Sequence, residues 1–145
     1  YKTGFGNDYV TETNLPTIFK EADIVSFHTP LIPETEFFIN DSFINSFEKD
    51  IYIINTSRGK CLKTADLVKH LKSGKVKGAC LDVLEFESTS FENVDVNSLP
   101  EDMQYLIQSN NVILTPHIAG WTHESNYKMS KIIAEKIIKT LNDLP

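Results

Sequence analysis

The sequence predicts an α/β fold built on a doubly wound parallel sheet. Four short apolar runs lack polar alternation, which is typical of strands that are buried on both faces of such a sheet. Helical patterns lie between these runs, and this alternation is typical of βα units with right-handed crossovers. The chain of 145 residues is long enough to bury one core. We therefore expect a single domain, or part of one.

The predicted strands are the apolar runs themselves, at residues 23–27, 51–54, 76–84 and 111–114. We expect side chains from both faces of these strands to be buried. Strand 23–27 is expected at an edge of the sheet, where an apolar strand invites pairing with another chain. We therefore expect the chain to associate or to be poorly soluble.

Five helices are predicted around these strands. Asn14, Leu15 and Pro16 open the first helix, with the proline near the initial turn, where its missing N–H costs little. Thr64 is the expected N-cap of the third helix, which ends at Ser73 and Gly74. The second, fourth and fifth helices are expected at 41–47, 103–107 and 122–141. The fifth carries a stripe that we expect to be buried, made of Ile132, Ile133, Ile137, Ile138 and Leu141.

Composition argues against several classes of partner. The net charge is −6, and no lysine or arginine occurs between Lys77 and Lys128, so we expect neither nucleic acid nor a membrane as a partner. The two cysteines have no metal-ligand spacing, so we predict no metal site and a reducing, cytoplasmic location. Because the chain begins with Tyr1, we expect it to be part of a longer protein.

Chemically active side chains follow three of the predicted strands. In a parallel sheet the residues just past the strand ends gather along one edge, where ligands bind. These residues are Arg58 after the second strand, Asp82, Glu85 and Glu87 around the end of the third, and His117 after the fourth. Of the fourteen basic residues Arg58 alone is an arginine, which suggests a bidentate grip on a carboxylate or phosphate.

An arginine, a carboxylate and a histidine can together catalyse a hydride transfer on a 2-hydroxy acid. The arginine holds the substrate carboxylate and polarises the carbonyl. The histidine exchanges the hydroxyl proton, because its pKa lies near the operating pH. A carboxylate on the other imidazole nitrogen fixes the tautomer. A nicotinamide cofactor would exchange the hydride.

Four segments carry a resemblance to a known family. They are residues 22–31 (ADIVSFHTPL), 54–59 (INTSRG), 78–83 (GACLDV) and 115–120 (TPHIAG). The sequence resembles the D-isomer-specific 2-hydroxyacid dehydrogenase family, in the branch that contains D-3-phosphoglycerate dehydrogenase. The resemblance implies a Rossmann-like nucleotide-binding domain, NAD as cofactor, and a small D-2-hydroxy acid or 2-keto acid as substrate, with 3-phosphoglycerate as one candidate. We expect the full-length protein to be a homodimer.

The resemblance implies catalytic roles for three residues. Arg58 binds the substrate carboxylate, His117 is the general acid/base, and Glu87 is the carboxylate partner of His117. Glu87 lies five residues beyond Asp82, as the catalytic glutamate does in the family. It is followed by serine where the family usually has proline, and Glu85 is the alternative partner.

The resemblance also implies how the cofactor is bound. Asp82 binds the nicotinamide carboxamide with the backbone of Thr56 and Ser57 nearby, and Gly120 leaves room near the nicotinamide ribose. A loop after the first strand borders the adenine. The expected cofactor-binding residues are His28, Thr29, Pro30, Thr56, Ser57, Arg58, Asp82, His117 and Gly120.

The family's phosphate-binding motif G-x-G-x-x-G does not occur in the sequence, because Gly4-Phe5-Gly6 is followed by a tyrosine at position 9. We therefore expect residues 1–145 to be a partial NAD(P)-binding domain that lacks this loop and the substrate domain. The isolated chain is expected to be inactive, and the choice between NAD and NADP stays open. An alternative function is a dinucleotide-sensing, corepressor-like binding protein on the same fold.

Overall fold

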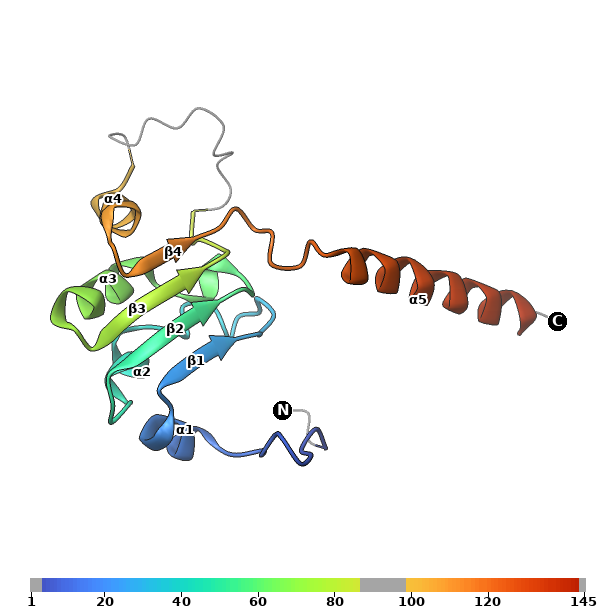
Figure 1. Ribbon diagram of the computed structural model, residues 1–145, viewed down its shortest axis with the longest axis horizontal. Coiled ribbons are helices and arrows are strands. Elements are labelled where there is room, and N and C mark those ends of the chain that lie inside the picture. The colour runs from blue at the N-terminus through green and yellow to red at the C-terminus, as the bar shows by residue number, and fades with distance from the viewer. Residues whose placement is uncertain (1–3, 87–98, 144–145) are drawn as a thin grey trace.

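The computed structural model describes residues 4–86 and 99–143, and a four-stranded parallel sheet lies at its centre (Figure 1). The strands lie side by side in the order β1 (Ile24–Phe27), β2 (Ile51–Asn55), β3 (Val76–Leu81) and β4 (Val112–Leu114). The α-helices are α1 (Leu15–Glu21), α2 (Asp41–Asn45), α3 (Thr64–Ser73), α4 (Glu101–Gln108) and α5 (His123–Asn142). A 3₁₀ turn, η1 (Gly59–Cys61), follows β2. The predicted α/β fold with a parallel sheet is confirmed.

Capping groups set the ends of the helices. At the start of α1 the Thr17 amide donates to Asn14 Oδ1 at 3.0 Å, and α3 ends at Gly74, whose φ is 83°, both as predicted. The predicted N-cap of α3 was wrong. Lys63 holds that position without a capping side chain, and the Thr64 amide donates to Glu85 Oε2 at 2.9 Å. A carboxylate distant in the sequence therefore satisfies this helix end.

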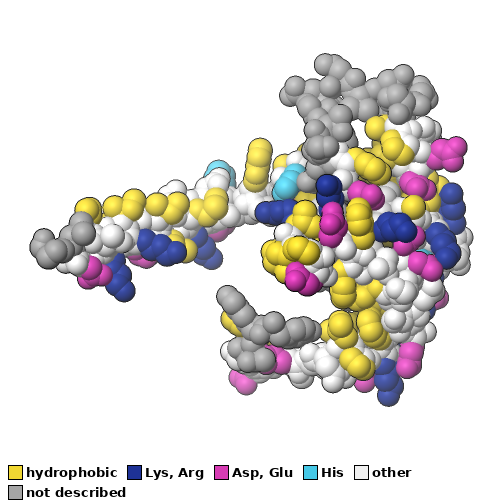
Figure 2. All heavy atoms as spheres, turned by 180° about the vertical axis from the view of Figure 1, so that it is seen from behind, with side chains coloured by type: hydrophobic (Ala, Val, Ile, Leu, Met, Phe, Trp, Pro, Cys, Tyr) yellow, Lys and Arg dark blue, Asp and Glu magenta, His cyan; other side chains and the backbone are white. Residues whose placement is uncertain are grey.

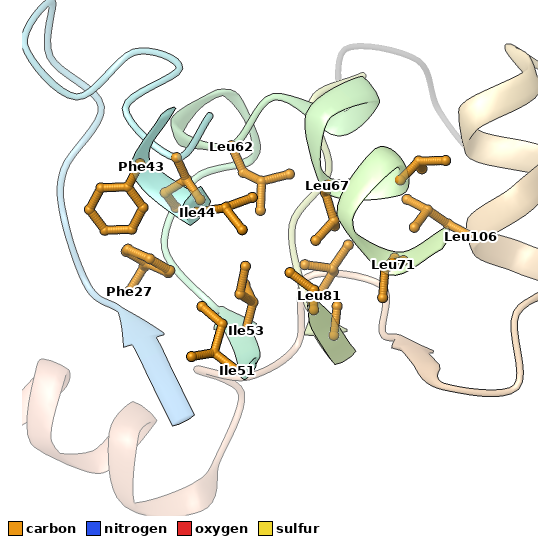
Figure 3. Close-up of a cluster of buried hydrophobic side chains, with 14 of the residues drawn as sticks. Phe27, Phe43, Ile44, Ile51, Ile53, Leu62, Leu67, Leu71, Leu81 and Leu106 are labelled. Carbon is orange, nitrogen blue, oxygen red and sulfur yellow. The ribbon is translucent and has the colours of Figure 1, made fainter. Parts of the chain in front are cut away.

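The core lies on one face of the sheet, beneath α2, α3 and α4 (Figure 3). Pairing in register brings Ile53 and Ala79 to this face, because alternate residues of parallel strands point to the same side. Leu67 of α3 belongs to the same buried cluster. At the β1 end, the rings of Phe27 and Phe43 lie 5.8 Å apart. These contacts fix the strands, and hence the residues that follow them.

The opposite face of the sheet is open in the part of the chain that the structure describes. Ile24, Tyr52 and Ile113 lie on it with 61%, 48% and 61% of their surface exposed. The prediction that both faces would be buried was therefore wrong for these residues, because α2, α3 and α4 form one connected layer against the other face. The prediction that the first strand would be an edge is confirmed, since among the described strands β1 has only β2 as a neighbour in the sheet.

Helix α5 extends away from the sheet and is joined to β4 by residues 115–122, which include His117 (Figure 1). Its helical boundaries agree with the prediction, but the burial of its apolar stripe was wrong. The stripe residues are 50–62% exposed, and hydrophobic side chains run along the helix in Figure 2. The stripe is exposed because the helix does not fold back on the sheet, and no residue of α5 is buried. No described helix, α5 included, has the length and apolar character needed to cross a membrane.

Candidate functional site

The predicted site residues follow the carboxyl ends of four adjacent strands. His28 comes directly after β1, and Arg58 lies three residues beyond Asn55, the last residue of β2. Asp82 directly follows β3, and His117 lies three residues beyond β4. Because all four strands are parallel, these residues share one edge of the sheet.

Hydrogen bonds from the side chain of Asn55, which is completely buried, stabilise the turn that carries Arg58. Asn55 Oδ1 accepts hydrogen bonds from the Ser57 amide at 3.1 Å and the Ser57 hydroxyl at 2.8 Å. Asn55 Nδ2 donates to the Arg58 carbonyl at 3.2 Å. The Arg58 side chain is exposed, and its Nη1 donates to the Ser57 carbonyl at 2.6 Å. The backbone that carries the Arg58 side chain is thus fixed, while the side chain itself is exposed to solvent.

Gly59 brings this turn against the chain that leaves β3. A Cβ added at Gly59 would lie 1.8 Å from the Leu84 carbonyl oxygen and 2.7 Å from the Glu85 amide nitrogen, so no side chain fits there. The contact joins the Arg58 turn to the start of the segment that leads to Glu87. Glu87 itself lies outside the described residues.

The structure bears on the alternative carboxylate, Glu85. Its side chain accepts the hydrogen bond from the Thr64 amide, at the first turn of α3. A carboxylate is favourable at a helix N-terminus, because it accepts from free amides and complements the helix dipole. This bond gives Glu85 a structural role in α3.

Asp82 holds the loop that carries His117. Its Oδ1 accepts from the Thr115 hydroxyl at 2.5 Å and from the Ile118 amide at 2.9 Å, and its Oδ2 accepts from the Ala119 amide at 2.9 Å. Burial raises the pKa of the Asp82 carboxyl, but these hydrogen bonds, aided by the nearby His117, outweigh burial and hold the pKa below the ordinary value of 3.8. Asp82 is therefore a buried, ionised anchor at neutral pH.

His117 occupies a left-handed backbone conformation, with a φ of 55°. Such a conformation is uncommon for residues other than glycine and persists where surrounding contacts impose it. The His117 amide donates to the Asp82 carbonyl at 2.9 Å and to the Thr115 carbonyl at 3.0 Å. The His117 amide is thus held by two main-chain carbonyls, while the residue itself is exposed.

A hollow of about 370 Å³ opens beside Asp82 on the uncovered side of the sheet. Thr56, Thr115, Ile118 and Ala119 line it together with Asp82, and Cys80, Leu81 and Ile113 complete the lining. Hydrogen bonds from the described residues use three of the roughly four acceptor positions of the Asp82 carboxylate, which leaves Oδ2 able to accept one more. An apolar wall with one free carboxylate position fits a nicotinamide ring and its carboxamide.

The other expected cofactor residues do not line this hollow. His28 Nε2 lies 2.9 Å from the Ser26 hydroxyl. Thr29 donates through its hydroxyl to Cys61 Sγ at 3.8 Å, and Cys61 Sγ donates to the Pro30 carbonyl at 3.9 Å. The loop after β1 is therefore fastened to η1, beside the Arg58 turn. At Gly120, apart from the adjacent residues of the chain, no heavy atom of the described residues lies within 4 Å of the position of an added Cβ.

Asn55, Gly59 and Thr115 were not among the predicted site residues. A polar residue that ends an apolar run and precedes an arginine turn is a signal that could have indicated Asn55. Gly59 gives no comparable signal, because its importance comes from a contact with residues 84 and 85. Within residues 4–86 and 99–143, no group of three or more His, Cys, Asp or Glu residues could hold a metal ion.

Comparison with known families identifies the chain. The family described as D-isomer specific 2-hydroxyacid dehydrogenase, NAD binding domain, matches residues 2–119. The chain belongs to this family. The resemblance of the four sequence segments to the 2-hydroxyacid dehydrogenases is thereby confirmed, and so is the expectation of an NAD-binding domain.

Individual 2-hydroxyacid dehydrogenases support this assignment. A glyoxylate reductase from Thermofilum pendens is 40% identical over 129 residues, which cover 89% of this chain and 35% of that protein. A Schizosaccharomyces pombe protein, provisionally named D-3-phosphoglycerate dehydrogenase, is 35% identical over 90% of this chain and 28% of its own length. The crystal structure of a Lactobacillus delbrueckii ssp. bulgaricus family member with NAD superposes with a TM-score of 0.78 and 38% identity, covering 92% of this chain and 41% of that one.

The names of these relatives bear on the cofactor and the substrate. The named relatives are dehydrogenases and a reductase, the matched family is described as an NAD-binding domain, and the Lactobacillus structure contains NAD; these relatives do not support the sensor alternative. Their names point to different substrates, so they do not single out phosphoglycerate. The chain spans between about a quarter and two-fifths of the length of these relatives.

Proposed function

We propose that this chain forms the nicotinamide-facing part of an enzyme that transfers a hydride between NAD and a small D-2-hydroxy acid. The observation that carries the proposal is the chain of contacts along the sheet edge. Asn55 holds the Arg58 turn and accepts, through its main-chain carbonyl, from the Asp82 amide at 3.0 Å. Asp82 in turn holds the His117 loop. One rigid framework therefore supports a carboxylate-binding group and a proton-exchanging group.

Arg58 would bind the substrate carboxylate. Its guanidinium presents parallel N–H donors that match the two carboxylate oxygens, and its position on a fixed turn limits the orientations that the substrate can adopt. An N–H of the same group would polarise the C2 carbonyl of a 2-keto acid. Because relatives with different substrate names match about nine-tenths of this chain, the contacts that choose among 2-keto acids are expected elsewhere in the protein.

His117 would donate a proton to the carbonyl oxygen during reduction and accept it from the hydroxyl during oxidation. Glu87 would hold the second imidazole nitrogen and stabilise the imidazolium. We assign this role to Glu87 and not to Glu85, because the Glu85 carboxylate already accepts from the Thr64 amide.

NAD is the proposed cofactor, and when bound it supplies or accepts the hydride at C2 of the substrate. Asp82 would accept from the carboxamide through the remaining position on Oδ2, and Thr56 and Ala119 would border the ring. We propose that the phosphate-binding loop and the substrate domain belong to other parts of a longer protein, since the chain spans a minority of each compared relative. A dimeric, cytoplasmic enzyme stays a prediction.

The test is NADH oxidation by the full-length protein with a panel of 2-keto acids: glyoxylate, pyruvate, hydroxypyruvate, 3-phosphohydroxypyruvate and an aromatic 2-keto acid. We expect turnover with at least one. Absence of turnover with every member would overturn the proposal. In the active protein, His117→Ala should lower kcat by about 10²–10⁴-fold while the Kd for NADH stays within about twofold. His123→Ala is the matched control, because this histidine opens α5, beyond the loop that Asp82 holds.

A further inference from the structure

We propose that Asn55 is a positioning residue that sets the direction of the Arg58 guanidinium and its placement relative to His117. The inference rests on the proposed function and deepens it. No site role was expected of Asn55 from the sequence; it is the last residue of β2, and its side chain is completely buried.

The side chain of Asn55 uses both ends of its amide. The Ser57 amide can only donate and the Arg58 carbonyl can only accept, so the orientation of the Asn55 amide is determined: Oδ1 faces Ser57 and Nδ2 faces Arg58. The Ser57 hydroxyl adds a second donor to Oδ1. Asn55 has no exposed surface, so water cannot replace these bonds. Asparagine alone supplies an acceptor and a donor at this length without a charge.

The hydrogen bonds of Asn55 also affect the direction of the Arg58 guanidinium. In the part of the chain that the structure describes, the Arg58 side chain has one hydrogen bond, from Nη1 to the Ser57 carbonyl. That carbonyl belongs to the same short turn whose amide and hydroxyl are bound to Asn55 Oδ1. The direction of the guanidinium therefore depends on a backbone that Asn55 fixes.

Asn55 also joins this turn to the acid/base loop. Its carbonyl accepts from the Asp82 amide at 3.0 Å, and the Asp82 carbonyl accepts from the His117 amide at 2.9 Å. Two main-chain hydrogen bonds thus connect Asn55 to His117. A change at the Asn55 side chain should move the Arg58 turn and leave these two bonds in place.

Asn55→Asp is the sharpest perturbation. It keeps the size of the side chain and an acceptor toward Ser57, but it turns the donor to the Arg58 carbonyl into a second acceptor. We expect the KM for the 2-keto acid to rise at least tenfold at neutral pH in the full-length protein, with the Kd for NADH within twofold of wild type. Because a protonated carboxyl regains a donor, the KM ratio between variant and wild type should fall as the pH is lowered.

The matched control is Asn111→Asp. Asn111 also donates through Nδ2 to a main-chain carbonyl, that of Lys77, at 2.9 Å, but it lies just before β4 at the opposite end of the sheet. The ratio of the KM of Asn111→Asp to the KM of the wild type should stay near one at every pH. A purely structural role of Asn55 would change KM and the NADH Kd together and would give no pH-dependent recovery.

An unchanged KM in folded Asn55→Asp, or equal losses in KM and NADH binding, would overturn the inference. If the variant does not fold, Ser57→Ala decides, because it removes one of the two donors to Oδ1. We then expect KM to rise more than twofold, and a smaller change would overturn the inference. The proposed function fails separately, if the wild-type protein reduces none of the 2-keto acids.

Discussion

Substitution of Gly59 by alanine should displace the chain that leads to the catalytic carboxylate. The added Cβ would lie 1.8 Å from the Leu84 carbonyl oxygen, 2.1 Å from the Leu84 carbonyl carbon and 2.7 Å from the Glu85 amide nitrogen. Real Cβ contacts essentially never fall under 3.0 Å, so the two backbones must separate by about 1.2 Å, the difference between 3.0 and 1.8 Å. All three atoms belong to backbone, so a side-chain rotation cannot relieve the overlap.

The cost follows from the size of this shift. Overpacking of a tight backbone contact costs about 1–3 kcal/mol of unfolding free energy. A displacement of about 1 Å in a catalytic group lowers activity by about 100-fold. Urea unfolding of Gly59→Ala should therefore show the stability loss, and kcat/KM for the 2-keto acid should fall by about 100-fold in the full-length protein.

Gly74→Ala provides the control. Gly74 has a φ of 83° with no atom within 4 Å of an added Cβ, so alanine there carries a backbone penalty of about 1–2 kcal/mol without a steric overlap. It ends α3, before β3 begins, away from the carboxyl edge. The two variants should lose similar stability, but Gly74→Ala should keep its kcat/KM. Wild-type activity in Gly59→Ala, or an equal loss of activity in both variants, would refute the reasoning.

Three further predictions concern the anchor, the helix cap and the open surfaces. Asp82→Asn should lower the unfolding free energy by about 1–3 kcal/mol at pH 7. Because the pKa of Asp82 in the folded protein lies below 3.8, the extra stability of the wild type over Asp82→Asn should be full above the unfolded-state pKa. It should be lost as the pH falls through the folded-state pKa. A stability difference that stays constant down to strong acid would contradict this. Glu85→Ala should cost about 0.5–2 kcal/mol by loss of the bond to the Thr64 amide, with kcat nearly unchanged; a kcat loss above tenfold would instead identify Glu85 as the partner of His117. The 145-residue chain should associate in sedimentation velocity as its concentration rises, through the β1 edge and the exposed α5 stripe, and a monomer at high concentration would contradict this.

The order of strands and helices could be predicted because local chemistry determines it. Buried parallel strands read as continuous apolar runs, and Asn14 and Gly74 mark helix ends through their own side chain or backbone freedom. Local patterns do not specify what covers an apolar surface. The stripe of α5 and the Tyr52 face of β2 look the same in sequence whether a neighbouring element covers them or not, and both are exposed.

Some residues of the candidate site could likewise be predicted from the sequence and others could not. Arg58 and His117 could be located because each follows a recognisable strand and such ends meet at one edge of a parallel sheet. The residues that hold them could not be predicted, since their contacts join distant parts of the sequence. Gly59 packs against the backbone of Leu84, and the Thr64 amide donates a hydrogen bond to Glu85, twenty-one residues away. Neither contact leaves a periodic pattern or a spacing motif.

Arg58 is the proposed carboxylate clamp, and Arg58→Lys in the full-length protein tests this central role directly. Lysine keeps the positive charge but replaces the two parallel donors by a point charge. The KM for the 2-keto acid should rise by about tenfold or more, equivalent to at least about 1.4 kcal/mol of lost binding, while the Kd for NADH stays the same. An unchanged KM would contradict the account.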